Sequence, residues 1–172
     1  AEDGIRDTSV TGVQRVLFRS CKTNAMIKVR KVEASDKARW MELFRGYIVF
    51  YEADIPAEQY ELTWNRLMDP NYECHGFVAE LDGKVVGLTH YSFQTSTWAP
   101  VNYCYLEDLF TDPEVRGKGV GRALIDAVKA VAEAGGSSRL YWNTDATNTT
   151  ARKLYDSYVP VSGKVQYRIK LD

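Results

Sequence analysis

Six consecutive residues, Arg116-Gly117-Lys118-Gly119-Val120-Gly121, form the segment of this chain with the clearest chemical meaning. They lie between a strand-like stretch that ends near Thr111 and an amphipathic stretch that starts at Val120. Glycine lets main-chain N–H groups approach an anion closely, and the unpaired N–H groups at a helix N-terminus add roughly half a positive charge. The segment therefore predicts a loop that binds a phosphate group, such as a pyrophosphate.

The spacing of the glycines indicates which class of phosphate-binding loop this segment forms. A Walker A loop needs a second glycine where this chain has Arg122, and the third glycine of a Rossmann loop has no counterpart either. The residues match the pattern Arg/Gln-x-x-Gly-x-Gly/Ala instead, through Arg116, Gly119 and Gly121. Arg116, Lys118 and Arg122 form a basic cluster. Without the glycines, such a cluster would be typical of a solvated helix start.

This loop resembles the coenzyme A loop of the GNAT N-acetyltransferase superfamily. Residues 105–111 also closely resemble the Leu-Glu-Asp-Phe-Phe-Val strand of spermidine/spermine and thialysine acetyltransferases. Residues 141–144, Asn148 and residues 151–155 resemble the fifth strand, splay and fourth helix of the family. Thr97-Trp98 and residues 165–168 resemble small fungal and bacterial GNAT proteins described as histone-tail, polyamine or D-amino-acid acetyltransferases. The resemblance is strongest over residues 103–155 and weaker over residues 26–96, and it is more specific for the family than for the substrate.

From the resemblance we expect acetyl-CoA as a cosubstrate. With two histidines and no second cysteine pair, we expect no metal. The main chain of Leu109, Phe110 and Thr111 would pair with the pantetheine arm as an added strand, and one N–H would polarise the thioester carbonyl. Asn148 would bind the pantetheine arm, cap the helix that follows it, or do both. The complete set of expected coenzyme A contacts is Leu109, Phe110, Thr111, Arg116, Gly117, Lys118, Gly119, Val120, Gly121, Arg122 and Asn148.

The resemblance places Glu107 where polyamine-type enzymes use a carboxylate to accept a proton. An amine like that of lysine has a pKa near ~10.4, so only about one molecule in a few thousand is the free nucleophile at pH 7. A carboxylate with a pKa near ~4.3 is a weak base, which favours a water relay, or binding of the neutral amine, over direct abstraction. On a regular strand Asp108 would face the opposite side and orient the substrate, whereas a bulge would alter this. A salt bridge to a neighbouring Arg or Lys is the simpler interpretation of an isolated Glu-Asp pair.

Tyr155 matches the general-acid tyrosine of the family, seven residues after Asn148. A thiol has a pKa near ~8.5 and a phenol near ~10, so a protonated tyrosine can hydrogen-bond or donate to the leaving thiolate. Most of the chain's 11 tyrosines are expected to be half-buried structural residues, and only its position distinguishes Tyr155. Most GNAT enzymes have a glycine soon afterwards, whereas here it is delayed to Gly163, which changes one expected wall of the acceptor site.

The acceptor site is expected to bind a cation. Acidic residues crowd the segment between the first two helices, which borders the acceptor cleft in GNAT enzymes, and Glu52 and Asp54 are the candidate contacts, with Glu58 and Glu61 nearby. His90 and Trp98, with Tyr91 and Tyr103, could line the cleft with aromatic faces that attract ammonium groups. Exposed helix carboxylates and ordinary sheet packing explain the same residues equally well.

The resemblance thus implies an acetyl-CoA-dependent N-acetyltransferase that acts on a primary amine of a small molecule, by direct attack in a ternary complex. The acceptor would be a polyamine, an amino acid or a lysine analogue. One alternative is a protein lysine or N-terminal acetyltransferase. Another is a non-catalytic acyl-CoA sensor, which the presence of Glu107, Asn148 and Tyr155 disfavours.

Composition agrees with one compact enzyme domain. The 172 residues are 45% hydrophobic, enough for a core but short for two domains. A net charge of −1 gives no bulk attraction to nucleic acid or to an anionic membrane, and no apolar run approaches a membrane span. Three cysteines without a CxxC pair argue against disulfides and for a cytoplasmic location. A homodimer is compatible with the sequence but not required by it.

The expected elements form a mixed, mostly antiparallel α/β (α+β) sheet of six to seven strands with about four helices. Residues 1–25 are expected to be a foreign or disordered extension, with a strand at residues 13–18 as the alternative, and residues 26–172 a single domain. The expected strands are 26–32, 77–81, 84–93, 105–111, 140–143 and 164–171, with an Asp82-Gly83 turn. The expected helices are one capped by Ser35, then 57–68, 120–134 and 149–157.

Overall fold

The computed structural model of the chain describes residues 16–19 and 26–171. The chain divides into two units, residues 1–142 and residues 143–172, and each is described by itself. The expectation of one domain from residue 26 onward therefore stays a prediction.

A single mixed sheet organises the first unit. Its six described strands lie in chain order, and all neighbours are antiparallel except β5 and β6, which are parallel. The strands are β1 Val16–Arg19, β2 Met26–Lys31, β3 His75–Leu81, β4 Lys84–Gln94, β5 Tyr103–Thr111 and β6 Leu140–Tyr141. The predicted fold class is confirmed, and five of the six predicted strands form, with β1 as the sixth described strand.

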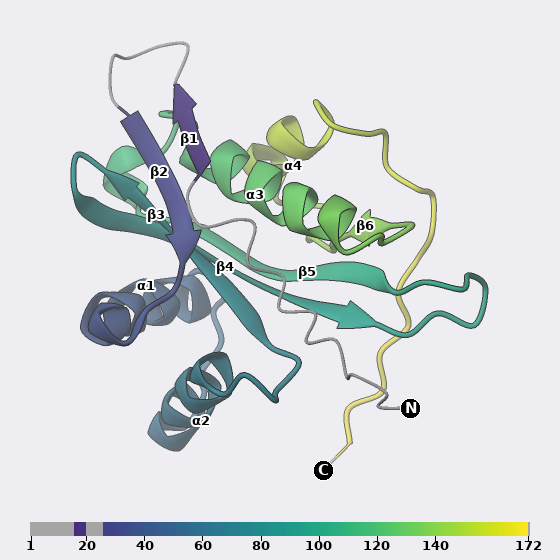
Figure 1. The fold of residues 1–172 in the computed structure, drawn as a ribbon, viewed down its shortest axis with the longest axis horizontal. Coiled ribbons are helices and arrows are strands. Elements are labelled where there is room, and N and C mark those ends of the chain that lie inside the picture. Colours follow the sequence, from purple (N-terminus) through teal and green to yellow (C-terminus); the bar gives the residue numbers. More distant parts are fainter. Residues whose placement is uncertain (1–15, 20–25, 172) are drawn as a thin grey trace, which may run out of the picture. The chain divides into compact units, whose positions relative to one another are not determined.

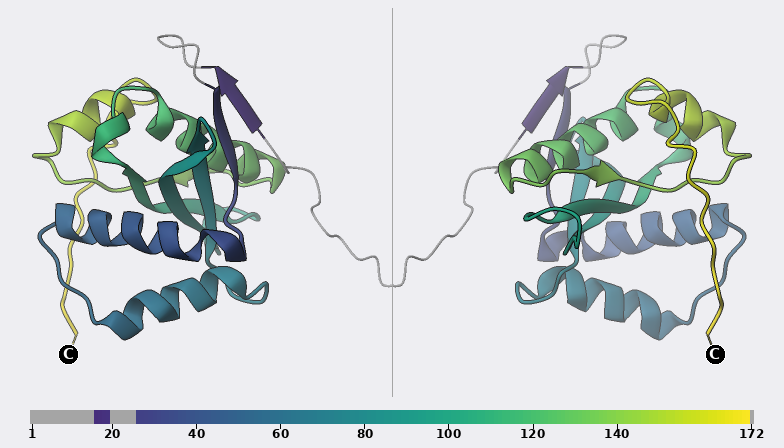
Figure 2. Two further views of the ribbon diagram at one scale, coloured as in Figure 1. Left: turned by 90° about the vertical axis from the view of Figure 1, so that its left-hand side faces the viewer. Right: turned by 90° about the vertical axis from the view of Figure 1, so that its right-hand side faces the viewer.

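Helices cover both faces of this sheet. α1 (Lys37–Phe50) and α2 (Ala57–Met68) lie on one face, and α3 (Val120–Ala134) lies on the other (Figures 1 and 2). Two short 3-10 helices, η1 (Ala34–Asp36) and η2 (Pro113–Val115), precede α1 and α3. η2 and the glycine loop carry the chain from the end of β5 into α3, so the fold connects the central strand directly to the predicted phosphate loop.

The two faces bury different kinds of side chain. Under α1 and α2 lies an aromatic cluster of Trp40, Leu43, Phe44, Tyr60, Trp64, Leu88 and Phe110. α3 contributes an aliphatic stripe of Val120, Ala123, Leu124, Ala127 and Val128, all of which are buried. The amphipathic stretch predicted from Val120 is confirmed, and burial of apolar surface is the main force that holds the helices on the sheet.

The β3–β4 hairpin forms as predicted. Asp82 and Gly83 have φ values of 51° and 79°, so both central residues of the turn are left-handed. This geometry matches the right-handed twist of paired strands, which is why Asp-Gly favours it.

The start of α1 differs from the prediction, because Ser35 is not its cap. η1 occupies residues 34–36, and its cap is Glu33, whose main-chain N–H donates to Asp36 at 2.8 Å. Arg30 donates two hydrogen bonds to Asp36, at 2.6 and 2.8 Å, and also contacts Glu80 at 2.6 Å. A buried carboxylate tied to a neighbouring strand outweighs the local preference of a serine for the cap position.

The second unit contains α4 (Thr149–Tyr155) and a C-terminal segment without helix or strand. The predicted strand at residues 164–171 is therefore wrong for this structure. Its alternating apolar side chains, Val165, Tyr167 and Ile169, are each at least 74% exposed. Alternation favours a strand only when a neighbouring strand accepts its hydrogen bonds and one face is covered, and the sequence pattern cannot report either condition.

β1 falls within the predicted N-terminal extension. Val16–Arg19 pairs with β2, which overlaps the alternative of a strand at residues 13–18. The rest of the prediction for residues 1–25 lies outside the described residues. Among the described helices, none is both long and apolar enough to cross a membrane.

Gly87 on β4 is expected to be essential for the close packing of α3 against the sheet. A Cβ atom at this position would lie 2.8 Å from Cγ1 of Val120, 3.0 Å from the main-chain oxygen of Phe110 and 3.2 Å from Cδ1 of Leu124. We expect Gly87→Ala to lower the free energy of unfolding by about 1–3 kcal/mol in urea denaturation, because the core must shift. Gly76→Ala is the matched control, since its nearest contacts are side-chain ends at 3.2 Å or more. Equal losses in the two variants would contradict this explanation.

Candidate active site

A bulge in β5 determines where its two carboxylates lie. In the pairing with β4, His90 is opposite Asp108 and Tyr91 is opposite Leu106, so Glu107 has no partner. The extra residue shifts the alternation of β5 by one position. Asp108 consequently lies on the α1 side, level with His90, instead of facing the opposite side as a regular strand would place it.

Asp108 is held by a chain of hydrogen bonds from two other elements. His90 Nδ1 lies 2.8 Å from Asp108 Oδ2, and Trp40 Nε1 on α1 lies 2.9 Å from the other ring nitrogen, His90 Nε2. Tyr47 on α1 lies close to Asp108, and burial, followed by the negative charge of Asp108, raises the pKa of Tyr47. His90, which itself accepts a hydrogen bond from Trp40, thus holds Asp108 beside Tyr47.

Glu107 lies beside this array and is exposed. Surrounding protein nevertheless removes part of its hydration, and this effect, followed by the negative charge of Asp108, raises the pKa of Glu107. Burial, followed by the charges of Glu107 and Asp108, also raises the pKa of the Cys74 thiol to about 11. Glu107 is therefore a stronger base than an ordinary carboxylate, whereas Cys74 is protonated at neutral pH and a poor nucleophile.

The glycine loop has the geometry of an anion-binding turn. Gly117 and Gly119 have φ values of 78° and 94°, which only glycine adopts without strain. Gly119 is the N-cap of the 15-residue helix α3 and has no side chain to occupy its first-turn N–H groups. Arg122 on the first turn is exposed. These features fit a pyrophosphate, whose charge the helix N-terminus would stabilise.

One edge of β5 is open next to this loop. β6 pairs only with Cys104 and Tyr105 of β5, so among the described pairings Leu109, Phe110 and Thr111 are paired only with β4. Unpaired main-chain groups along an edge can accept an extended ligand as an added strand. The expected pairing of this segment with a pantetheine arm fits the structure.

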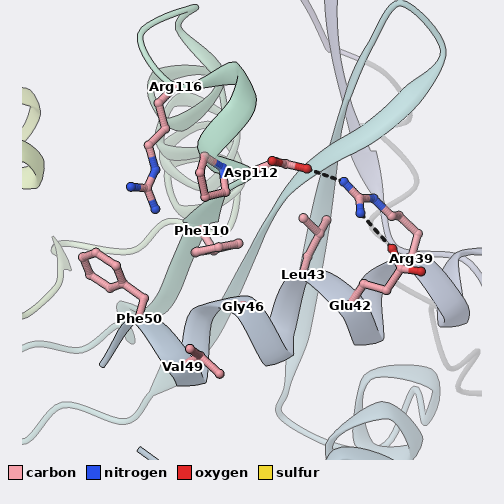
Figure 3. Close-up of a pocket in the computed structure, with 10 residues that line it drawn as sticks. Arg39, Glu42, Leu43, Gly46, Val49, Phe50, Phe110, Asp112 and Arg116 are labelled. Atoms are coloured by element: carbon pink, nitrogen blue, oxygen red, sulfur yellow. Dashed lines mark hydrogen bonds and ion pairs between the residues drawn. The ribbon is translucent and has the colours of Figure 1, made fainter. Parts of the chain in front are cut away.

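A pocket of about 350 Å³ lies between α1 and the end of β5 (Figure 3). Phe110 lies at its centre, and Gly46 on α1 allows this ring to approach, since a Cβ there would be 3.0 Å from it. The Arg116 guanidinium lies over the Phe50 and Phe110 rings, 5.4 and 5.9 Å from their centroids. At the other end Arg39 pairs with Asp112 at 2.5 Å. The remaining lining residues are Glu42, Leu43, Val49 and Pro113.

Comparisons with known proteins decide the family. A family model described as Acetyltransferase (GNAT) family matches residues 40–158. The D-amino-acid N-acetyltransferase HPA3 of Saccharomyces cerevisiae is 32% identical over 147 residues, which cover 84% of this chain and 91% of that protein. The chain belongs to the GNAT acetyltransferase family. A second relative in this family, the thialysine N-epsilon-acetyltransferase of Mus musculus, is 42% identical over 143 residues, with 72% of this chain and 81% of that protein covered.

Solved structures share the GNAT fold at low sequence identity. The aminoglycoside N-acetyltransferase AAC(6')-Iy in complex with CoA has a TM-score of 0.73 at 18% identity, with 87% of this chain and 97% of that chain covered. A ribosomal-protein-alanine N-acetyltransferase from Brucella melitensis biovar Abortus 2308 has a TM-score of 0.69 at 21% identity, with 84% and 99% covered. These likenesses therefore show that this chain has the GNAT fold.

The structure brings together only some of the predicted GNAT site residues. Glu107, Asp108 and His90 form one cluster, but His90 is only 3% exposed and lies behind Asp108 instead of lining a cleft. Glu52 and Asp54 are exposed in the segment between α1 and α2, and no hydrogen bond or ion pair among the described residues joins either to this cluster. Trp98 is 85% exposed in the β4–β5 connection. The direct roles predicted for these residues in substrate binding stay predictions.

Two predicted GNAT residues belong to the second unit. Asn148 is the N-cap of α4, and its Oδ1 accepts a hydrogen bond from the Ala151 N–H at 3.2 Å. Tyr155 is the last residue of α4 and is half-buried. The capping role of Asn148 is confirmed, while its role toward coenzyme A and the role of Tyr155 stay predictions. In the part of the chain that is described, no group of three or more His, Cys, Asp or Glu side chains could hold a metal ion.

Sequence reasoning missed Trp40 and Tyr47 as residues of this site. Both lie on the apolar stripe of α1, which helical spacing assigns to the core. Their polar atoms are the only local signal, because a buried indole N–H or phenol usually has a partner. The partner of Trp40, His90, lies on strand β4, so its identity could not be read from spacing.

Proposed function

We propose that this protein transfers the acetyl group of acetyl-CoA to a primary amine of a small molecule by direct attack in a ternary complex. The observation that carries the proposal is the order of groups along β5. The chain runs from the paired carboxylates Glu107 and Asp108, along the open edge at Leu109 to Thr111, to the phosphate loop. An amine, a thioester and a pyrophosphate would need sites in the same order.

In this proposal the glycine loop and the N-terminus of α3 bind the pyrophosphate, and the open edge of β5 binds the pantetheine arm. When bound, acetyl-CoA supplies the activated acetyl group. Glu107 accepts the amine proton, directly or through water, and its raised pKa supports this role. Asp108 orients the amine by its negative charge, and Tyr155 donates a proton to the departing thiolate.

The expected acceptor is a polyamine, an amino acid or a lysine analogue. The relatives named above act on D-amino acids and on thialysine, which supports a small amine-bearing acceptor. Glu107 and Asp108 give the site a local negative charge that suits a cation. A protein acceptor is the competing possibility, and it would require a site that takes an extended peptide.

The decisive experiment measures release of free thiol from acetyl-CoA by the full chain. The acceptor panel contains polyamines, thialysine and lysine, D- and L-amino acids, aminoglycosides and histone-tail peptides. We expect turnover with one class of small amine. Turnover only with peptides would replace the small-molecule proposal, and tight coenzyme A binding without turnover on any acceptor would support a sensor.

A further inference from the structure

We propose that His90 is a positioning residue, whose ring is oriented by the Trp40 indole and holds the Asp108 carboxylate toward the acceptor amine. The inference rests on the proposed function, because it assigns the purpose of a contact inside that site. Its physical basis is a continuous hydrogen-bonded chain from α1 through β4 to the bulge of β5.

The direction of each hydrogen bond follows from Trp40. An indole N–H can only donate, so His90 Nε2, 2.9 Å away, must accept. The ring proton therefore resides on Nδ1, which donates to Asp108 Oδ2 at 2.8 Å. A ring nitrogen that already accepts from Trp40 cannot also carry a proton without losing this bond. Trp40 thus selects the one neutral tautomer that can donate to Asp108.

The surroundings keep this arrangement dry and rigid. His90 is 3% exposed and Trp40 is 1% exposed. The Phe44 ring meets the His90 ring edge-on at 5.2 Å between centroids. Thr89 Oγ1 donates to the main-chain oxygen of Asp108 at 2.7 Å, which fixes the strand next to the bulge. The carboxylate therefore has one defined orientation instead of several.

The His90 and Tyr47 side chains beside Asp108 are neutral, and this has a chemical consequence. His90 donates a hydrogen bond to it, the Tyr47 phenol beside it is uncharged, and among the described residues no Lys or Arg forms an ion pair with Asp108. A lysine or arginine would fix the carboxylate equally well but would cancel its charge. A neutral donor orients Asp108 and leaves its negative charge available to a cationic acceptor.

Two substitutions of His90 separate positioning from packing. In His90→Asn the side-chain amide reaches the place of Nδ1 and can still donate to Asp108, but Trp40 loses its acceptor. In His90→Gln the amide reaches the place of Nε2 and can accept from Trp40, but Asp108 loses its donor. Each variant therefore breaks one of the two buried hydrogen bonds, and we expect similar decreases in melting temperature.

Steady-state kinetics with the best amine then distinguish the two roles. We expect His90→Asn to retain kcat/KM within a few-fold of the wild type. We expect His90→Gln to lower kcat/KM for the amine by roughly ten- to a hundredfold, the range for a lost hydrogen bond to a charged group, with KM for acetyl-CoA unchanged. Equal kcat/KM in the two variants, or a more active His90→Gln, would overturn the proposal.

A spectroscopic test is independent of activity. Nitrogen-15 NMR of the wild-type protein reports which ring nitrogen of His90 carries the proton, and His90→Asn identifies its signals against those of His75. We expect a protonated Nδ1 and an unprotonated Nε2 at neutral pH. A proton on Nε2 would overturn the inference whatever the activity. Absence of turnover by the wild type, with the expected tautomer present, would instead count against the proposed function.

Discussion

Replacing Glu107 with Gln is expected to lower kcat/KM for the amine by about 10²- to 10⁴-fold, the usual contribution of a general base. The amide has the same shape but cannot accept a proton from the acceptor or from a relaying water. In the wild type the raised pKa of Glu107 means that its ionised, proton-accepting form is reached only at a higher pH than for an ordinary carboxylic acid. Activity should therefore fall as pH decreases through this raised pKa, and the Glu107→Gln variant should lose this acidic limb.

Glu133→Gln is the matched control for this variant. Glu133 is exposed on α3, and its side chain forms a surface ion pair with Lys129 at 3.6 Å, so its loss should leave the pH profile unchanged. The measurement is thiol release against pH at saturating acetyl-CoA. If Glu107→Gln keeps both the wild-type rate and the acidic limb, the proton acceptor is another group and the assignment of Glu107 is wrong.

Replacing Tyr155 with Phe is expected to lower kcat by about 10²-fold, near the lower end of the usual range for general acid catalysis. The effect should be moderate because a thiolate, with a thiol pKa near ~8.5, is already a fair leaving group. Loss of the phenol should leave KM for the amine nearly unchanged, since the proposed role concerns only the departing sulfur. Initial rates with the same thiol assay measure both constants.

Tyr158→Phe provides the comparison for Tyr155. It is the same chemical change three residues later in the chain, and both side chains are half-buried. We expect the Tyr158 variant to keep kcat within a few-fold of the wild type, and both variants to have similar melting temperatures. Equal decreases in the two variants would indicate a structural effect, and an unchanged kcat in Tyr155→Phe would remove its role as an acid.

Local sequence was sufficient wherever a short segment sets its own geometry. The glycine loop needed positive φ values, and Gly117 and Gly119 have them. The Asp82-Gly83 turn and the amphipathic helix that starts at Val120 also formed as predicted. Each of these features depends on backbone preferences or on periodicity over a few residues, and both can be read directly from the sequence.

Long-range pairing decided the rest. The strand predicted at residues 164–171 has the right alternation, but alternation does not supply a neighbouring strand. Ser35 is a good capping residue, but a carboxylate bound by Arg30 from β2 took over the start of the helix. In both cases the deciding group belongs to another element of the fold, and Arg30, although only six residues before Asp36, also pairs with Glu80 of β3.

The sequence by itself determined the family, the phosphate loop and the presence of a Glu-Asp pair on the central strand, because these are contiguous motifs. Only the tertiary structure decided what the pair does. The register between β4 and β5 leaves Glu107 unpaired and places Asp108 opposite His90, and α1 brings Trp40 and Tyr47 to the same point. The charge and orientation of a carboxylate depend on such partners, which are 18 residues distant for His90 and farther for α1. No local pattern encodes them, since hydrogen bonds across strands and helices exist only once the chain has folded.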